Sequence, residues 1–414
     1  MTRFDLAGAT FKCFGAGSQR ACTPAETLRR VMPHARAMGI TRVAVITGLD
    51  HIGIPTVSVV RPNSRCLSVT QGKGCDLDAA KASGLMEAVE HYHAERVIRP
   101  LLRASLNELA DRHPTVDVHR LPGFVRDFSP HQRILWIEGT ALGSDSGWWL
   151  PYEMVHLDFS VPLPDSSGFF LMGSSGLASG NTLLEAVCHG IYELIERDAV
   201  TLFYARAAEE QWGRRVDPSS VDDPACRRLL ERYESAAVSV ALWDVTSDVG
   251  VACFLCSVLD ESPNPFRPIG AASGAGCHLD RGVALSRALN EAAQNRLTRI
   301  AGARDDLKAG ELEGLQTDEA RERSRAQMAQ PAFRQRSFSS LPSSSHDTFE
   351  ADIAFLCQRL EQADLEQVIA VDLSLPSFPV HVVRVVIPGL EGHSEIPGYK
   401  PGARARALTP RGRG

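Results

Sequence analysis

Apolar residues recur every three or four positions over residues 79–95, a period that predicts a helix with one buried face. At about 100° per residue, the opposite face of this helix gathers three oxygen-bearing side chains, Ser83, Glu87 and Glu90. The same division of apolar and polar positions predicts a second helix that begins near Asn181 and a third over 283–300.

The polar faces of the second and third helices repeat this chemistry. They carry Asn181, Glu185, Glu193, Glu196 and Arg197 in one, and Arg287, Glu291 and Gln294 in the other. Like charges one turn apart destabilise a helix by about 0.2–0.5 kcal/mol per pair, so these carboxylates need counter-charge. Oxygen ligands without Cys or His clusters suit Mg²⁺ or Ca²⁺, and Mg²⁺ commonly accompanies nucleotide phosphates. One such helix is explained by a solvated surface, whereas three together favour a cation site.

The order of helix, strand, Asp-containing turn and strand occurs three times. The helices are expected at 24–39, 224–236 and 350–362, and the strand pairs at 42–47 and 55–61, 238–244 and 250–258, and 367–372 and 381–388. Asp50, Asp244 and Asp372 follow the first strand of each pair, which indicates duplicated units in a mixed α/β protein. QGKG and GAGCH are interpreted as glycine turns, and no long helix follows the third unit.

Composition and charge narrow the class of protein. The chain has 414 residues, 44% of them hydrophobic, and a net charge of −6, which gives no basic field for nucleic acid. It has no apolar run long enough to cross a membrane and no signal peptide, so a cytoplasmic protein is expected. The ten cysteines are scattered and expected to be reduced. Cys253 and Cys256 fall on a strand, where they point to opposite faces and cannot share zinc.

The expected domain organisation has four parts. They are an N-terminal repeat unit over 1–62, a core with the cation site over 63–327, a Ser-rich surface linker over 328–346, and a C-terminal unit over 347–414. The acidic and basic run 308–327 is expected to form a solvated helix. The Arg-rich end, RARALTPRGRG, is expected to be a disordered tail.

Three segments carry a resemblance to a known family. SGNTLLEAVCHGIYELIERDA, GAGCHLDRGVALSRALNEAAQNRLTRIAGARDD and the stretch from TGLDH to HYHAE resemble the signature segments of the YcaO family. The resemblance implies a YcaO-like fold that binds ATP and Mg²⁺ in a cleft lined by helices. It agrees with the absence of a phosphate loop, because Lys73 in QGKG lacks the upstream glycine and the following Ser or Thr of that motif.

The resemblance also implies roles for residues at matching positions. The catalytic positions are Glu87, Glu196, Arg197 and Glu291. The nucleotide-binding positions are Lys73, Ser83, Asn181, Glu185, Glu193, Arg287, Gln294 and Arg296, with Arg304 as a weaker candidate. The Mg²⁺ ligands are Glu87, Glu90, Glu193 and Glu196. Other interpretations remain open: Glu193 as a surface glutamate, Arg197 as a structural partner of Asp198 or of a neighbouring Glu, Lys73 as a turn residue, and His189 as a substrate contact or a packing residue.

For this family the resemblance implies ATP-dependent O-phosphorylation of a peptide backbone amide, and the nucleophile decides the product. External sulfide gives a thioamide, a Cys, Ser or Thr side chain of a ribosomal peptide gives an azoline, and an amine gives an amidine. The chain ends without the PxPxP repeat of azoline-forming members, and it is more similar to members paired with a TfuA-type partner protein. Thioamidation is therefore expected, with cyclodehydration as the alternative.

Two alternatives come from other classes of protein. A non-catalytic nucleotide-binding accessory protein would have lost several ligand positions, and a Ca²⁺-binding structural protein would carry a D-x-[DN]-x-[DN]-G loop, which is absent. A homodimer is a mild expectation from the frequency of dimers among soluble enzymes.

Overall fold

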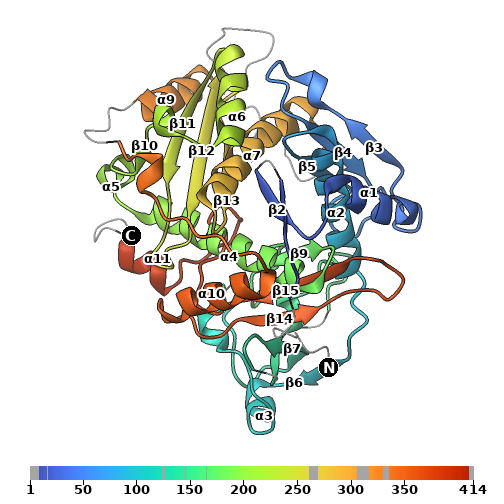
Figure 1. Cartoon of the computed structure of the whole chain (residues 1–414). Coiled ribbons are helices and arrows are strands. Elements are labelled where there is room, and N and C mark those ends of the chain that lie inside the picture. Colours follow the sequence, from blue (N-terminus) through green and yellow to red (C-terminus); the bar gives the residue numbers. More distant parts are fainter. Residues whose placement is uncertain are drawn as a thin grey trace.

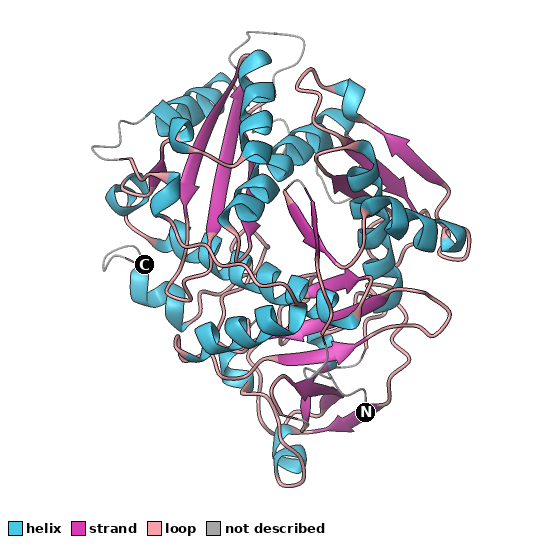
Figure 2. Cartoon of the chain, viewed as in Figure 1, coloured by secondary structure: helices cyan, strands magenta, loops and turns pink. Residues whose placement is uncertain are grey.

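The computed structural model of the chain is a mixed α/β protein, as expected, in which helices and strands alternate (Figures 1 and 2). It describes residues 9–15, 17–123, 126–144, 146–164, 166–260, 269–304, 317–329 and 335–409. Three separate sheets surround the centre of the molecule, and three long helices run between them (Figure 1).

The first unit is a three-stranded antiparallel sheet covered by a long helix. The strands are β3 (Arg42–Val45), β4 (Thr56–Val60) and β5 (Val69–Lys73), and the helix is α2 (Leu77–Ala94). Helix α1 (Pro24–Val31) precedes the sheet and is capped by Thr23, whose hydroxyl accepts from the Glu26 N–H. It ends well before residue 39, because Pro33 supplies no N–H and the chain continues as a 3₁₀ turn over Met32–His34.

The second unit repeats this arrangement. Its sheet contains β10 (Arg215–Val216), β11 (Val238–Asp244), β12 (Cys253–Asp260) and β13 (Ala272–Cys277), with α6 (Pro224–Ser235) before β11 and α7 (Arg281–Ala301) after β13. Cys253 packs in the core around α4, whereas Cys256 packs in the core under α6. The two thiols therefore lie on opposite faces of β12, as expected.

The third unit is assembled from two distant parts of the chain. Helix α10 (Phe349–Glu361) and strands β14 (Ile369–Asp372) and β15 (His381–Val386) come from the C-terminal part. Strand β9 (Leu177–Gly180) pairs antiparallel with β15 and leads into α4 (Leu183–Ala205). The expectation that no long helix follows this unit in the sequence is confirmed for the described residues, since only the short α11 (Ala403–Leu408) comes after β15, and the helix of the unit lies earlier in the chain. Further strands extend the sheet, namely β6 (Leu101–Ala104), β7 (Ile134–Ala141) and β8 (Gly147–Pro151).

The interpretation of QGKG and GAGCH as turns is wrong, because both segments belong to strands. A Cβ on Gly72 in β5 would lie 2.0 Å from the Ala80 carbonyl oxygen, and one on Gly276 in β13 would lie 2.1 Å from that of Ala284. These strands contain glycine because the backbone of the following helix packs directly against them.

The remaining described helices and strands are short. They are β1 (Cys13–Gly15), β2 (Ser18–Arg20), α3 (Leu106–Ala110), α5 (Ala208–Trp212), α9 (Asp318–Ala329) and α11 (Ala403–Leu408). The expected disordered tail is ordered as far as residue 409, since Arg404 in α11 lies 2.9 Å from the buried Asp198 of α4. Residues 410–414 lie outside the described residues.

The predicted linker and the acidic and basic run before it are described only in part. Helix α9 has no buried residue, in agreement with the expected solvated helix, while 305–316 and 330–334 lie outside the described residues. Phe338 and Leu341 are buried in the core of the second unit, so this part of the linker segment is packed rather than free. The division into four parts stays a prediction.

All ten cysteines are free thiols. In the described part of the chain, every helix is too short or too polar to cross a bilayer.

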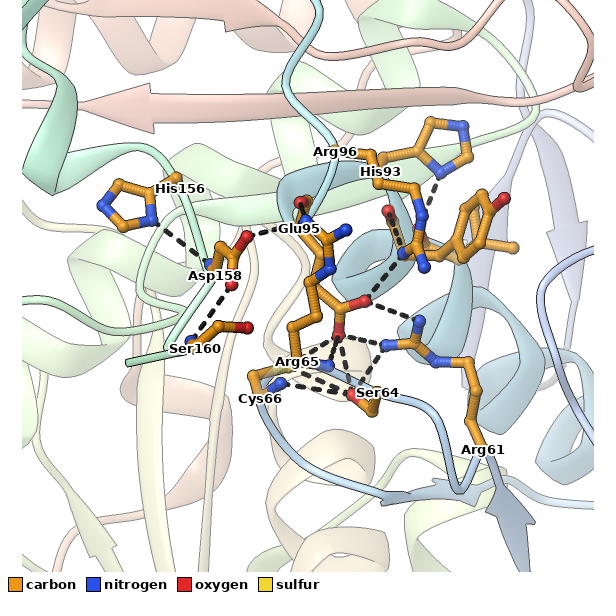
Figure 3. A network of polar contacts seen from close by, with 12 residues as sticks. Arg61, Ser64, Arg65, Cys66, His93, Glu95, Arg96, His156, Asp158 and Ser160 are labelled. Carbon is orange, nitrogen blue, oxygen red and sulfur yellow. Dashed lines mark hydrogen bonds and ion pairs between the residues drawn. The ribbon is translucent and has the colours of Figure 1, made fainter. Parts of the chain in front are cut away.

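A buried polar network around Glu95 fixes the C-terminal end of α2 (Figure 3). Its carboxylate accepts from Arg61, from the Ser64 hydroxyl at 2.7 Å, from the Arg65 N–H at 3.0 Å and from Arg96 at 2.8 Å. Burial raises the pKa of Glu95, but Arg61 and Ser64 outweigh it and lower the pKa to about 2. Removing one partner of such a buried pair costs about 3–5 kcal/mol, so this network holds α2 in one position.

Gly276→Ala is expected to destabilise the protein by about 1–3 kcal/mol, because the new methyl group would collide with the backbone of α7. The matched control is Gly48→Ala, since a Cβ at Gly48 has no atom within 4 Å. Urea unfolding of both variants measures the difference, and equal stabilities would contradict the role assigned to Gly276.

Acid is expected to destabilise the fold through His93 and His156, which are buried and whose pKa values burial lowers to about 4. The ordinary value is 6.5, so the folded state binds fewer protons and loses stability as the pH falls from about 6.5 to 4. His156→Gln is expected to reduce this slope by about 1 kcal/mol per pH unit. The free energy of unfolding, measured against pH for both proteins, tests this, and identical slopes would rule it out.

Candidate active site

The three long helices α2, α4 and α7 present equivalent acidic positions to the centre of the molecule. Ten residues after the first residue of each helix lie Glu87, Glu193 and Glu291. Thirteen residues after it lie Glu90, Glu196 and Gln294. The three units therefore repeat in their chemistry as well as in their fold.

Glu87 and Glu291, two of the three glutamates ten residues into their helices, each bond the edge strand of their own unit. Strands β5 and β13 each end their sheet, and their outer N–H groups have no strand partner. The Gln71 N–H donates to Glu87 Oε2 at 3.1 Å, and the Ala275 N–H donates to Glu291 Oε1 at 3.4 Å. Each bond fixes one carboxylate oxygen. The second oxygen of Glu87 stays available for a ligand, whereas that of Glu291 bonds Lys73.

Glu90, Glu196 and Gln294, thirteen residues into their helices, each bond the edge strand of a different unit. Glu90 Oε1 accepts from the N–H and the hydroxyl of Ser179 in β9, at 2.9 and 2.7 Å. Glu196 Oε2 accepts from the Cys277 N–H in β13 at 3.1 Å, and Gln294 Nε2 donates to the Gln71 carbonyl in β5 at 3.0 Å. These bonds run from the first unit to the third, from the third to the second, and from the second to the first, which closes a ring.

Three acids of the site, Glu87 and Glu90 on α2 and Glu193 on α4, hold their protons more tightly than ordinary carboxyl groups. Burial raises the pKa of Glu90 to about 8, and the nearby Glu87 and Glu193 add to the shift although Ser179 opposes it. Burial likewise raises the pKa of Glu193 to about 7, against the attraction of Arg197. The pKa of Glu87 is also raised by burial.

Positive charge gathers between α4 and α7. Lys73 forms an ion pair with Glu291, Arg197 lies 3.7 Å from both Glu193 and Glu196, and Arg287 lies 3.9 Å from Glu196. Burial raises the pKa of Glu291, but Lys73 and Arg197 outweigh it and lower that pKa to about 2. Arg197 thus pairs with neighbouring glutamates rather than with Asp198, which pairs with Arg404, and its role in the site stays a prediction.

The residues present fit a magnesium–nucleotide complex. Among the described residues, no group of three or more His, Cys, Asp or Glu is arranged to hold a metal ion alone. Mg²⁺ usually takes one or two carboxylates together with substrate phosphates, and Glu90 and Glu193 supply such a pair. The buried Arg287 Nε has no hydrogen-bond partner within the described part of the chain, which leaves it available for an anion.

Three further predicted residues lie near the N-terminal ends of these helices. Ser83 is one turn before Glu87 on the same helix. Asn181 donates through its N–H to Glu185 Oε2 at 2.8 Å, and Arg20 from β2 lies 3.5 Å from Glu185. A small cavity beside this group is lined by Arg20, Glu185, Arg287 and the neutral His189, whose pKa burial lowers well below its usual value.

Arg296 is not brought into the site. Its guanidinium is buried and donates to Asp50 at 2.8 Å and to Asp260 at 3.0 Å, which ties α7 to the turn between β3 and β4. The sequence placed Arg296 two residues after Gln294, and on a helix that spacing directs the two side chains to different faces.

Two residues beside the acids were not predicted. Ser179 bonds Glu90, and the buried Arg384 of β15 attracts Glu193 and Glu90, although burial lowers its pKa to about 10. Both residues lie in strands, so the helical spacing that predicted the other site residues could not identify them. Arg304 is also near, since its charge opposes the raised pKa of Glu87.

Comparison with known proteins identifies the family of this site. The family model described as "YcaO cyclodehydratase, ATP- and Mg²⁺-binding" matches residues 71–391 of this chain. The chain therefore belongs to the YcaO family. YcaO proteins are ATP-dependent peptide-modifying enzymes, and the expectation of ATP and Mg²⁺ as cofactors is confirmed.

Two relatives extend along most of the chain. An "uncharacterized protein in tfuA 3'region" of Rhizobium leguminosarum bv. trifolii is 37% identical over 376 residues, which are 90% of this chain and 88% of the relative. An uncharacterized protein of Methanothermobacter thermautotrophicus is 34% identical over 386 residues, which are 91% of this chain and 96% of the relative.

Solved structures confirm the YcaO-like fold. YcaO from Methanopyrus kandleri, bound with AMPPCP and Mg²⁺, has a TM-score of 0.73 and 23% identity, with 95% of this chain and 100% of that chain covered. A heterocyclase in complex with substrate and cofactor has a TM-score of 0.76 and 23% identity. The match covers 93% of this chain and about half, 54%, of the heterocyclase.

Glu193→Gln is expected to stabilise the metal-free protein at pH 8 by on the order of 1–3 kcal/mol, because it removes a buried charge whose pKa is raised to about 7 from 4.5. The gain should fall as the pH drops through 7 and vanish near 4.5, where both states are protonated. Urea unfolding without metal measures the change in the free energy of unfolding.

Glu26→Gln is the control, since Arg29 and Arg30 lower the Glu26 pKa to about 2 and no gain in stability is expected there. A Glu193→Gln variant that is less stable than the wild type at pH 8 would contradict the raised pKa of Glu193.

Proposed function

We propose that this protein uses ATP and Mg²⁺ to convert a peptide backbone amide to a thioamide with external sulfide, together with a TfuA-type partner protein. The observation that carries the proposal is the pair of acids Glu90 and Glu193 on different helices, together with the cations Lys73, Arg197 and Arg287 that gather between α4 and α7. The relative from the tfuA 3' region supports sulfide as the nucleophile.

The chain's own groups divide the work. Glu87, Glu90, Glu193 and Glu196 would hold the metal, and the backbone amides that bond them fix the direction of each carboxylate. Lys73, Arg197 and Arg287 offset negative charge that develops between α4 and α7. Ser83, Asn181, Glu185 and Gln294 would bind other parts of the nucleotide or support those that do.

Bound Mg²⁺·ATP supplies the phosphoryl group that makes the amide oxygen a leaving group. Sulfide forms the new C–S bond at the amide carbon, and the C–O bond breaks as the oxygen departs in phosphate. Positioning and charge neutralisation suffice for phosphoryl transfer, so the site needs no nucleophilic side chain of its own.

Glu87→Gln and Glu196→Gln are expected to reduce peptide-dependent phosphate release by at least about a hundredfold without unfolding the protein, since each removes charge at the metal site. Phosphate release with Mg²⁺, ATP and co-purified peptide is the measurement, and Glu234→Gln, on the exposed side of α6, is the control. Normal release by both variants would remove the proposed metal site.

Mass spectrometry of a peptide co-expressed with this chain and its genomic neighbours identifies the product. Exchange of oxygen for sulfur supports thioamidation, whereas loss of water indicates an azoline. An unchanged peptide with normal ATP binding would favour an accessory role.

A further inference from the structure

The N-terminal part of the described chain crosses the centre of the molecule. Residues 10–15 and 17–20, which we call the N-terminal strap, contain β1 and β2, and these form a two-stranded sheet. Figure 1 shows β2 in the middle of the molecule. A two-stranded hairpin is at best marginally stable alone in water, so the position of the strap depends on its contacts with the rest of the fold.

Hydrogen bonds fasten the beginning of the strap to the N-terminal end of α10. The Thr10 N–H and hydroxyl donate to Glu350 Oε1 at 2.9 and 2.7 Å, and the Phe349 N–H donates to the Thr10 carbonyl at 3.1 Å. The Lys12 N–H donates to the Asp347 carbonyl at 3.0 Å. These bonds place Lys12 beside the first turn of α10.

The Lys12 ammonium is buried and forms an ion pair with Asp352 in this first turn. Its Nζ lies 2.6 Å from Asp352 Oδ2, and only 1% of each side chain is exposed. The same ammonium donates to Gln19 Oε1 in β2 at 3.2 Å. Asp352 also accepts from the Tyr192 hydroxyl of α4 at 3.0 Å, and its other oxygen lies 2.9 Å from His346 Nδ1. One carboxylate therefore connects both strands of the strap region to α4.

Both ends of this connection reach the small cavity beside Glu185. Gln19 and Tyr192 line this cavity, whose volume is about 60 Å³. Arg20 follows Gln19 in β2, also lines the cavity, and lies 3.5 Å from Glu185. A displacement of Gln19 would therefore carry Arg20 away from Glu185. Asp352 acts on the cavity from outside its lining, through the residues that it holds.

We propose that Asp352 is a positioning residue for nucleotide binding. Through Lys12 it fixes Gln19, and the strap then keeps Arg20 beside Glu185. The inference rests on the proposed function, because that function places the nucleotide beside Glu185. A buried ammonium without a counter-ion is strongly unfavourable, so without the Asp352 charge the strap is expected to shift toward solvent and to take Arg20 with it.

The test measures the dissociation constant of Mg²⁺·AMPPCP by isothermal titration calorimetry, without peptide. Asp352→Asn keeps the size of the side chain but removes its charge, and it is expected to raise the dissociation constant about tenfold. Asp244→Asn is the matched control, since Asp244 of β11 is a buried carboxylate that pairs with Arg336, and neither residue lines the cavity. The control is expected to lose thermal stability while it binds nucleotide as the wild type does.

Gln19→Ala tests the same connection without exposing a buried charge. Gln19 is partly exposed, so its loss should change thermal unfolding little. The loss of its bond to Lys12 is expected to raise the dissociation constant about threefold. This variant decides the question if Asp352→Asn does not fold.

Wild-type affinity in a less stable Asp352→Asn would show a purely structural role and overturn the proposal. Wild-type affinity in Gln19→Ala, or an equal loss of affinity in Asp244→Asn, would overturn it as well. Unmodified peptide in the product test would count against the proposed function while the nucleotide affinities still differ as described, so the two failures are distinguishable.

Discussion

The structure depends on how four carboxylates at its centre are held by backbone N–H groups. Glu87, Glu90, Glu196 and Glu291 each bond a backbone N–H at the open edge of a sheet. A backbone N–H at a sheet edge and a buried carboxylate each destabilise the fold when they lack a hydrogen-bond partner. Each of these bonds pairs one such N–H with one such carboxylate. In Glu87, Glu90 and Glu196 the strand bonds fix one oxygen of each carboxylate, and the other oxygen of Glu196 lies 3.7 Å from Arg197. The same contacts therefore complete the fold and orient the site.

This constraint explains the order of elements in the chain. The bonds from α2 to β9, from α4 to β13 and from α7 to β5 require three sheets whose last strands face one centre. The third sheet obtains its last strand and helix from residues 177–205, whereas β14 and β15 come from residues 369–386 and its remaining strands from residues 101–151. The ring closes in space although the sequence is permuted, so the C-terminal segment cannot form this unit alone.

Much of the ring could be predicted from the sequence, because its helices are amphipathic and begin at Asp or Thr caps. The spacing of Glu87 and Glu90, or of Glu193 and Glu196, follows from the helical period alone. The strands before those helices could not be predicted, since glycine is a turn signal and its role here comes from contact with a helix. The pairing of β9 with β15 spans some two hundred residues and leaves no local pattern. Arg296 was assigned to the site because it lies on the same helix as Glu291 and Gln294. Its side chain leaves another face of that helix and pairs with Asp50.

The ring repeats its acids but not its cations, and this difference gives the site a direction. Between α2 and α4, the pKa values of Glu90 and Glu193 are both raised by burial, although Ser179 opposes the shift of Glu90 and Arg197 that of Glu193. Between α4 and α7, Lys73, Arg197 and Arg287 meet Glu291 and Glu196. A metal ion gains most at the first junction and a phosphate at the second. Three equivalent backbones with unequal side chains thus bind an asymmetric ligand in one orientation, which a fully symmetric ring could not do.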